Sequence, residues 1–137
     1  MITVVDVETS WQVTDTGGYD PSPYHPDNIL VSVGINDEYY FTNHSERIDK
    51  GCYHKIQSIL DKTTLLVGHN IKFDLMWLLE AGFKYTGRVY DTMLGEYILN
   101  RGIRKSLTLE MSCRRRKIGS KDSSIKEYMD RGVSFEN

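Results

Sequence analysis

The chain has 137 residues, of which 39% are hydrophobic and 26% are charged, as is ordinary for one soluble globular domain with a proper core. No run of about 18 apolar residues occurs, so no membrane span is expected, and the N-terminus lacks the pattern of a secretory signal. Cys52 and Cys113 stand far apart, so we expect two reduced thiols in a cytoplasmic protein rather than a disulfide or a zinc site.

The net charge of −2 conceals an uneven distribution along the chain. Residues 101–137 contain ten Lys or Arg residues and five Asp or Glu residues, a balance of +5 that leaves −7 for residues 1–100. An acidic part with a basic extension suits a protein that collects cations at one place and contacts phosphates at another. Solvated helix surfaces would give a similar count, so both interpretations stay open.

Two carboxylates occur in the first segment of the chain. Ile2, Val4 and Val5 lead into Asp6 and Glu8, and this run predicts a buried opening strand. Residues two apart on a strand point to the same side, so both carboxylates are expected at one place. A divalent cation would relieve their repulsion and lost hydration, which predicts a metal site. Two acids at the point where a strand emerges into solvent are an equally open interpretation.

The next segments predict a loop and a hairpin. Residues from Thr9 to Asp27 are rich in Gly, Pro, Asp and Tyr and predict an irregular loop of a length that is often functional. A strand is expected over Ile29–Ile35, followed by a tight turn at Asn36–Asp37 and a partner strand over Glu38–Thr42.

Helices and strands alternate in the rest of the chain. The spacing of apolar residues predicts a helix over Tyr53–Leu60, a short strand over Thr63–Val67, and a helix that opens at Gly68–Asn70 and ends at Ala81–Gly82. The remaining predicted elements are a strand at Val89–Tyr90 and helices over Asp91–Leu99, Leu107–Cys113 and Ile125–Met129, with a basic linker between the last two. A strand meander followed by alternation predicts one α/β domain, a mixed β-sheet with helices packed on its faces.

A third carboxylate is predicted near the first two. Asn70 is in the N-cap position of its helix and Asp74 is in the first turn or so, where the helix dipole favours an anion. Helices of such sheets begin near the carboxyl ends of strands, where ligands gather, so Asp74 is expected to reach Asp6 and Glu8. A helix-favouring surface acid is the alternative, and spacing alone does not separate the two.

Several segments match the motifs of one enzyme family in order and spacing. Asp6–Glu8 has the pattern Asp-x-Glu, and residues 68–74 combine an Asn, a spacer, an aromatic residue and an Asp. These resemble the first two motifs of the DEDD (DnaQ-like) 3′–5′ exonucleases. Residues 89–100, 105–110 and 125–128 are similar to the proofreading exonuclease domain of family A DNA polymerases. The resemblance covers nearly the whole chain except the loop at 9–27.

The resemblance implies an RNase H-like fold and two divalent ions, Mg²⁺ or Mn²⁺, at a nucleic-acid 3′ end. It implies that Asp6 bridges both ions, Glu8 holds the catalytic one and Asp74 supports the second. Two such ions can activate the attacking water and stabilise the leaving 3′ oxygen. Hard oxygen ligands suit these ions, and the sequence has no competing His-Cys cluster.

The chain departs from the family in its last motif. A fourth carboxylate is expected as Tyr-x-x-x-Asp or His-x-x-x-x-x-Asp, yet no Tyr or His of this chain has an Asp at that spacing. Asp122 and Asp130 are the nearest substitutes, and neither has the spacing. We therefore expect a single exonuclease domain over residues 1–137 that lacks its C-terminal catalytic helix and whose catalytic metal site is weakened.

Candidate substrate contacts come from several segments. They are Thr9, Asn70, Phe73, Arg114 and Arg115. Thr9 and Phe73, with Leu75, are candidates to line the pocket of the terminal base, although core packing explains Phe73 and Leu75 equally well. The basic run 114–117 is a candidate for phosphate contacts, and a solvated helix end is the alternative.

Further residues lie in or near the same segments. Asp91 is expected to cap its helix rather than to bind metal, and His69 is expected to be a hydrogen-bonded loop histidine. Trp11, Tyr19 and Tyr24 in the long loop are candidates for stacking on single-stranded bases, and packing of the loop onto the domain is the alternative.

The resemblance predicts a metal-dependent 3′–5′ exonuclease domain, the proofreading module of a family A-like DNA polymerase. Its expected partners are single-stranded DNA 3′ ends, a polymerase domain and other replication proteins. The short N-terminus before the opening strand suggests a compact, phage-encoded version that works in a bacterial cytoplasm. Two alternatives stay open, an RNase D-like exoribonuclease and a catalytically inactive nucleic-acid-binding remnant.

Overall fold

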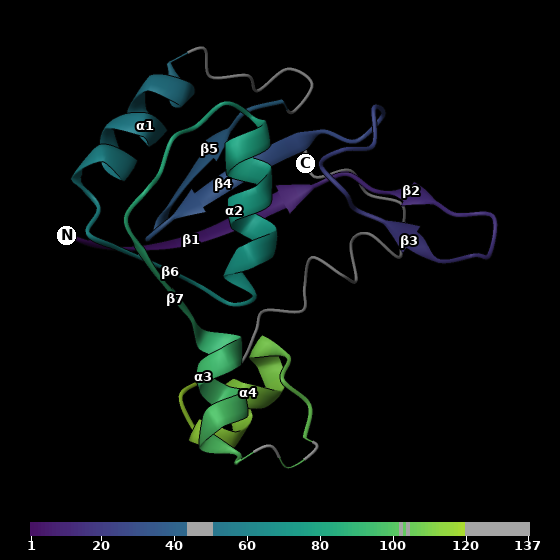
Figure 1. The fold of residues 1–137 in the computed structure, drawn as a ribbon, viewed down its shortest axis with the longest axis vertical. Coiled ribbons are helices and arrows are strands. Elements are labelled where there is room, and N and C mark those ends of the chain that lie inside the picture. Colours follow the sequence, from purple (N-terminus) through teal and green to yellow (C-terminus); the bar gives the residue numbers. More distant parts are fainter. Residues whose placement is uncertain (44–50, 102, 104, 120–137) are drawn as a thin grey trace. The chain divides into compact units, whose positions relative to one another are not determined.

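The computed structural model describes residues 1–43, 51–101, 103 and 105–119. The chain forms two compact units, Met1–Thr92 and Met93–Asn137. The strands are β1 (Ile2–Thr9), β2 (Gln12–Val13), β3 (Tyr19–Asp20), β4 (Leu30–Ile35), β5 (Glu38–Phe41), β6 (Leu65–Gly68) and β7 (Arg88–Asp91), and the helices are α1 (Cys52–Lys62), α2 (Ile71–Glu80), α3 (Thr92–Leu99) and α4 (Leu109–Arg116) (Figure 1). None of the helices in the described ranges is long and apolar enough to cross a membrane.

The first unit is built on a five-stranded sheet with the order β5-β4-β1-β6-β7. Strands β1, β4 and β5 form antiparallel pairs, while β6 is parallel to β1 and β7 is parallel to β6. The antiparallel part follows from a tight turn at Asn36, which has a left-handed φ of 53°. The parallel part needs crossover connections, which α1 and α2 provide. The result is the predicted α/β fold with a mixed sheet, consistent with an RNase H-like fold.

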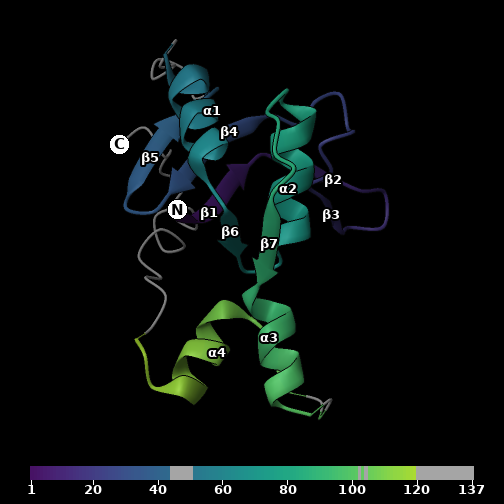
Figure 2. The same cartoon turned by 60° about the vertical axis from the view of Figure 1, so that its left-hand side comes forward.

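The core lies between one face of this sheet and the helices α1 and α2 (Figure 2). Side chains of β1 alternate between buried and exposed, with Thr3, Val5 and Val7 buried, because successive residues of a strand point to opposite faces. Helix α1 contributes Cys52, Ile56 and Leu60 to the core, and α2 contributes Ile71, Trp77 and Leu78. Cys52 is buried and Cys113 is partly buried, and no disulfide joins them.

The largest difference from the predicted elements is in the loop after β1. Residues Thr9 to Asp27 were expected to be irregular, yet β2 and β3 form a short hairpin within them. Its turn is closed by Gly17 N–H donating to Thr14 O at 2.9 Å, with Gly17 at a left-handed φ of 81°. Two-residue strands fall below the length at which alternation is visible in a sequence.

The basic run was expected either in a linker or at a helix end, and the structure shows the helix end. Arg114, Arg115 and Arg116 belong to the last turn of α4 and not to a linker, since cations near a helix C-terminus are favoured by the helix dipole. The predicted helix over Ile125–Met129 lies outside the described residues.

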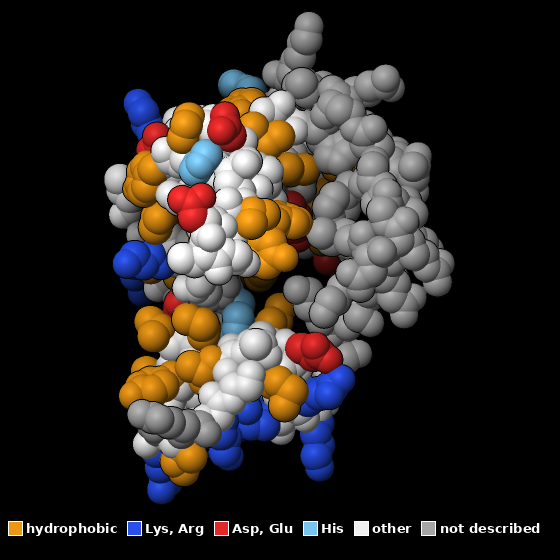
Figure 3. All heavy atoms as spheres, turned by 90° about the vertical axis from the view of Figure 1, so that its right-hand side faces the viewer, with side chains coloured by type: hydrophobic (Ala, Val, Ile, Leu, Met, Phe, Trp, Pro, Cys, Tyr) orange, Lys and Arg blue, Asp and Glu red, His pale blue; other side chains and the backbone are white. Residues whose placement is uncertain are grey.

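The second unit joins α3 to α4 through a buried carboxylate. Glu96 of α3 accepts hydrogen bonds from Arg115 Nε at 2.9 Å and from Arg116 Nε at 3.2 Å. These bonds, the one from Arg115 foremost, hold the pKa of Glu96 below its usual value. Lys and Arg side chains gather on the surface formed by this unit (Figure 3), in line with the basic charge of the C-terminal part.

Candidate active site

Asp6 and Glu8 both lie on the exposed side of β1, opposite the core. They share that side because they are two residues apart on one strand. The β1–β4 register shifts between Glu8 and Thr9, since Glu8 pairs with Ser32 and Thr9 pairs with Leu30. This bulge ends the regular ladder directly after the two carboxylates, as bulges beside functional sites often do.

The end of β6 and the start of α2 approach β1 closely. A Cβ atom on Gly68 would lie 2.6 Å from Ile71 Cδ1 and 3.3 Å from Val5 O, so only glycine fits without a shift of its neighbours. The chain then turns at Asn70, which has a left-handed backbone with φ 61° and ψ 51°. Asn70 is at the predicted N-cap position, but its side chain makes no capping hydrogen bond.

Asp74 is placed by this turn against the middle strand. Its Oδ1 accepts a hydrogen bond from Val7 N–H at 2.9 Å, and its side chain is buried, with only 3% of the residue exposed. Val7 is the residue between Asp6 and Glu8, so the third predicted carboxylate contacts the backbone of the first motif. Asp74 is therefore not a solvated surface acid.

Burial raises the pKa of Asp74 to about 7. The hydrogen bond from Val7 N–H works against this shift, and the negative charges of Asp6 and Asp91 add to it. A carboxylate with this environment is costly to ionise without a compensating cation. The donor set, oxygen atoms of carboxylates, is the one that Mg²⁺ and Mn²⁺ prefer.

The site has the oxygen donors that a divalent cation prefers, but the side chains do not surround a single point. Asp6 and Asp74 lie close enough for their charges to interact, whereas no group of three or more His, Cys, Asp or Glu side chains in the described ranges is arranged to hold a metal ion. Glu8 shares the exposed side of β1 with Asp6. The structure thus brings Asp6 and Asp74 together without closing all three predicted ligands around one point.

A polar network surrounds the turn before α2. Asp91 Oδ1 accepts a hydrogen bond from Asn70 N–H at 2.9 Å, and His69 Nδ1 lies 2.9 Å from Thr92 Oγ1. His69 is thus the hydrogen-bonded loop histidine that the sequence predicts. The bond from Asn70 to Asp91 could not be found in the sequence, because nothing in the spacing of residues 70 and 91 shows that β6 and β7 pair.

The other predicted substrate contacts differ in their surroundings. Thr9 is half-buried at the bulge, and Phe73 is partly buried against the core. Arg114 pairs with Glu110 at 2.7 Å, on the surface of α4. Arg115 is directed inward, since its Nη2 also donates to Ser106 O at 2.6 Å and its side chain is only 21% exposed. A phosphate role for Arg114 and Arg115 stays a prediction.

The aromatic residues of the long loop contact each other but remain exposed to solvent. Trp11 and Tyr19 form an edge-to-face pair with ring centroids 6.1 Å apart, and both are exposed, as is Tyr24. Trp77 Nε1 of α2 donates to Pro21 O at 3.0 Å, which ties the loop to the core. Stacking of these rings on bases stays a prediction.

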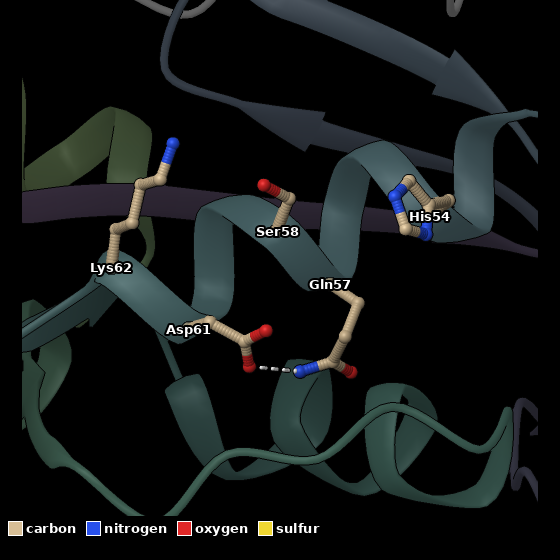
Figure 4. A pocket seen from close by; sticks show the side chains of 5 residues that line it. All are labelled: His54, Gln57, Ser58, Asp61 and Lys62. Carbon is tan, nitrogen blue, oxygen red and sulfur yellow. Dashed lines mark hydrogen bonds between the residues drawn. The ribbon is translucent and has the colours of Figure 1, made fainter.

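A shallow pocket on α1 contains none of the predicted site residues. It is lined by His54, Gln57, Ser58, Asp61 and Lys62, all on one helix (Figure 4). Gln57 holds the segment after α2, because its Nε2 donates to Lys84 O and its Oε1 accepts from Lys84 N–H. We therefore assign Gln57 a structural role.

The comparison with family models identifies the class of protein. A model of a 3′–5′ exonuclease family, of the DNA polymerase A type, matches residues 14–110, and the chain belongs to this family. The match includes Asp74 but begins after Asp6 and Glu8, so it does not depend on the first motif. No curated protein matches the chain significantly. The chain is thus a 3′–5′ exonuclease domain, a hydrolase of phosphodiester bonds whose substrate is nucleic acid.

Proposed function

We propose that this chain is the proofreading domain of a family A-like DNA polymerase and removes nucleotides from single-stranded DNA 3′ ends. In this proposal Asp6, Glu8 and Asp74 hold two divalent ions, Mg²⁺ or Mn²⁺. The observation that carries the proposal is the contact of the buried Asp74 carboxylate with the backbone of Val7, between the other two acids. A buried acid beside two exposed ones is an arrangement that a cation would stabilise.

The proposed roles follow from the surroundings of each carboxylate. When bound, the two ions would activate the attacking water and stabilise charge on the leaving 3′ oxygen. Asp6 and Glu8 face solvent on β1, where a DNA end can approach. Asp74 is held by the Val7 N–H, so its second oxygen stays oriented without loss of side-chain freedom on binding. Asn70 presents an exposed carboxamide at the same end of α2.

We further propose that a segment outside these residues completes the domain with a helix that carries a fourth carboxylate. No Asp of the chain follows a Tyr or a His at the family spacing. Ile2 and Val4, which share the exposed side of β1 with Asp6, are 65% and 50% exposed. Large exposed apolar side chains beside a site are typical of a surface that another element covers.

The metal proposal is tested by titrating the chain with Mn²⁺. Wild-type protein should bind Mn²⁺, and Asp6→Ala should abolish that binding because it removes the ligand predicted to bridge both ions. Asp61→Ala is the matched control, since Asp61 is an exposed acid on α1 whose side chain accepts a hydrogen bond from Gln57 of the same helix. Wild-type affinity in Asp6→Ala would remove Asp6 from the site.

The substrate proposal is tested with matched DNA and RNA oligonucleotides. We expect very low Mg²⁺-dependent digestion by the chain alone, and a rate higher by orders of magnitude after fusion to a helix carrying Tyr-x-x-x-Asp. A preference for RNA would favour the exoribonuclease alternative, because contacts to the 2′-hydroxyl decide such preferences. Rapid digestion by the unextended chain, unaffected by Asp122→Ala and Asp130→Ala, would overturn the proposed need for a fourth ligand.

A further inference from the structure

Asn70 combines three features that a simple helix cap does not have. Its backbone is left-handed, its side chain makes no capping bond, and it is exposed to solvent. Asn tolerates this conformation better than most residues, yet such a conformation persists only where the surroundings fix it. A neighbouring group must therefore hold Asn70 in this conformation at the edge of the candidate site.

The group that holds Asn70 is at the end of the neighbouring strand. Gly68 pairs with Asp91 in the parallel β6–β7 ladder, which places the β7–α3 junction beside the turn before α2. Asp91 Oδ1 accepts from Asn70 N–H at 2.9 Å. One residue later, Thr92 Oγ1 lies 2.9 Å from His69 Nδ1 and donates to Gly68 O at 3.3 Å. Asp91 and Thr92, at the end of β7, thus form hydrogen bonds with Gly68, His69 and Asn70, at the end of β6.

These hydrogen bonds fix the backbone conformation of Asn70. An ionised carboxylate is a strong acceptor for a backbone N–H, and the bond satisfies a donor that a regular helix start leaves without an intrahelical partner. Because the backbone of Asn70 is anchored by Asp91, its carboxamide is not needed at the helix terminus and stays available. A carboxamide offers both donors and an acceptor, which matches the sugar and base edges of a terminal nucleotide.

We propose that Asp91 is a positioning residue for the 3′-terminal nucleotide and acts through Asn70. The inference rests on the proposed function, since it assigns a role at the same site. Asp91 itself need not touch the substrate or a metal ion. Its contribution is to keep the left-handed turn at Asn70, and thereby the carboxamide, in the conformation that contacts the DNA end.

The test is a double-mutant cycle on binding of an oligodeoxythymidine with a free 3′-hydroxyl and a non-cleavable phosphorothioate terminus. Fluorescence anisotropy in Mn²⁺ should show affinity about tenfold weaker for Asp91→Ala, by analogy with the loss of groups that orient ligands. Asn70→Ala should weaken binding similarly, and the double variant no further, because both changes remove one interaction. Asp91→Asn retains an acceptor oxygen and should restore most of the affinity. Asp61→Ala is the control.

Two further measurements separate positioning from a general loss of structure. Hydrogen exchange at the Asn70 amide should be faster in Asp91→Ala, while the melting temperature and the affinity for a circular oligonucleotide, which has no 3′ end, should change little. Additive losses in the double variant, or unchanged affinity in Asp91→Ala, would overturn the role of Asp91 and leave the proposed function intact. Failure of the wild-type chain to prefer the linear oligonucleotide would overturn both.

Discussion

Val7 N–H donates to Asp74 Oδ1 at 2.9 Å, which joins the middle strand to the first turn of α2. The backbone of Val4 bonds to Asn36 beyond the end of β4, so by alternation the N–H of Val7 is directed toward β6. Pairing with β6 ends at Val4 and Val67, which leaves this donor without a strand partner. Asp74 satisfies it, and a buried backbone donor thereby fixes the position of a predicted metal ligand.

The first prediction concerns Asp74→Asn and pH. Burial raises the pKa of Asp74 from 3.8 to about 7, so the folded protein retains a proton that the unfolded chain has released between those values. Stability of the metal-free protein therefore falls as pH rises from about 4 to about 7. At pH 8 Asp74→Asn should raise the free energy of unfolding by about 1–3 kcal/mol, measured by urea denaturation in EDTA.

The higher stability of Asp74→Asn relative to the wild type should disappear under two conditions. At pH 3 the carboxyl is mostly protonated in both the folded protein and the unfolded chain, so the two proteins should unfold at nearly the same urea concentration. With Mn²⁺ at pH 8 the wild type should gain stability and Asp74→Asn should not, because binding to the folded state alone stabilises it. A variant that is less stable than wild type at pH 8 in EDTA would show that the cost of the buried charge is outweighed by the interactions that the carboxylate makes.

The second prediction concerns the close approach at Gly68. Gly68→Ala should destabilise the protein by about 1–3 kcal/mol, as overpacked cores do, since the new Cβ would meet Ile71 Cδ1 at 2.6 Å. Ile71→Val removes that atom, so the double variant should recover part of the loss in thermal denaturation. Val5 O at 3.3 Å limits the recovery. No recovery at all would place the strain on the backbone of β1 instead.

Much of the sheet was predictable because its strands carry strong local patterns. Apolar runs and the Asn36 turn mark β4 and β5, and the alternation of β1 marks the shared side of Asp6 and Glu8. The order of the strands in the sheet was not predicted, because no local pattern shows which strands pair. The mixed sheet was expected, while the short hairpin of β2 and β3 was not.

Contacts between distant residues were the part that local patterns did not show. Asp74 was expected near the first strand, but its bond to Val7 depends on where β6 stops pairing. Glu96 appears in the sequence as one acid on an apolar helix, and only the fold shows that Arg115 and Arg116 reach it. Asn70 is at the predicted N-cap position of α2, but its side chain makes no capping hydrogen bond.

The third prediction tests the carboxylate that joins α3 to α4. Glu96→Gln removes the charge that Arg115 and Arg116 share, and should speed hydrogen exchange of the α4 amides. The pKa of Glu96 is held below its usual value, so its contribution is present above the unfolded pKa and is lost as pH falls through the lower folded pKa. Wild-type α4 should thus approach the variant in strong acid. Glu110→Gln, which removes only an exposed pair, is the control and should change exchange little.

The last prediction concerns Asn28, which anchors the loop after β1. Its Nδ2 donates to Asp20 O at 2.9 Å and Ser22 O at 3.0 Å, and its Oδ1 accepts from Gln12 Nε2 at 3.3 Å. Asn28→Ala should therefore leave two partly buried carbonyls without this donor, which costs up to about 1–3 kcal/mol, and should release the loop to limited proteolysis.

Tryptophan fluorescence provides a second measure of the Asn28→Ala variant. Trp77 is buried and bonded to Pro21 of this loop, so its shielding from acrylamide should fall when the loop detaches, whereas Trp11 is already 42% exposed. Asn28→Asp keeps an acceptor but loses both donors, and should behave more like Asn28→Ala than like wild type. Thr16→Ala removes only an exposed bond to Thr14 in the same loop and should match the wild type. If Asn28→Ala leaves proteolysis and quenching unchanged, the Trp77 bond and not Asn28 holds the loop in place.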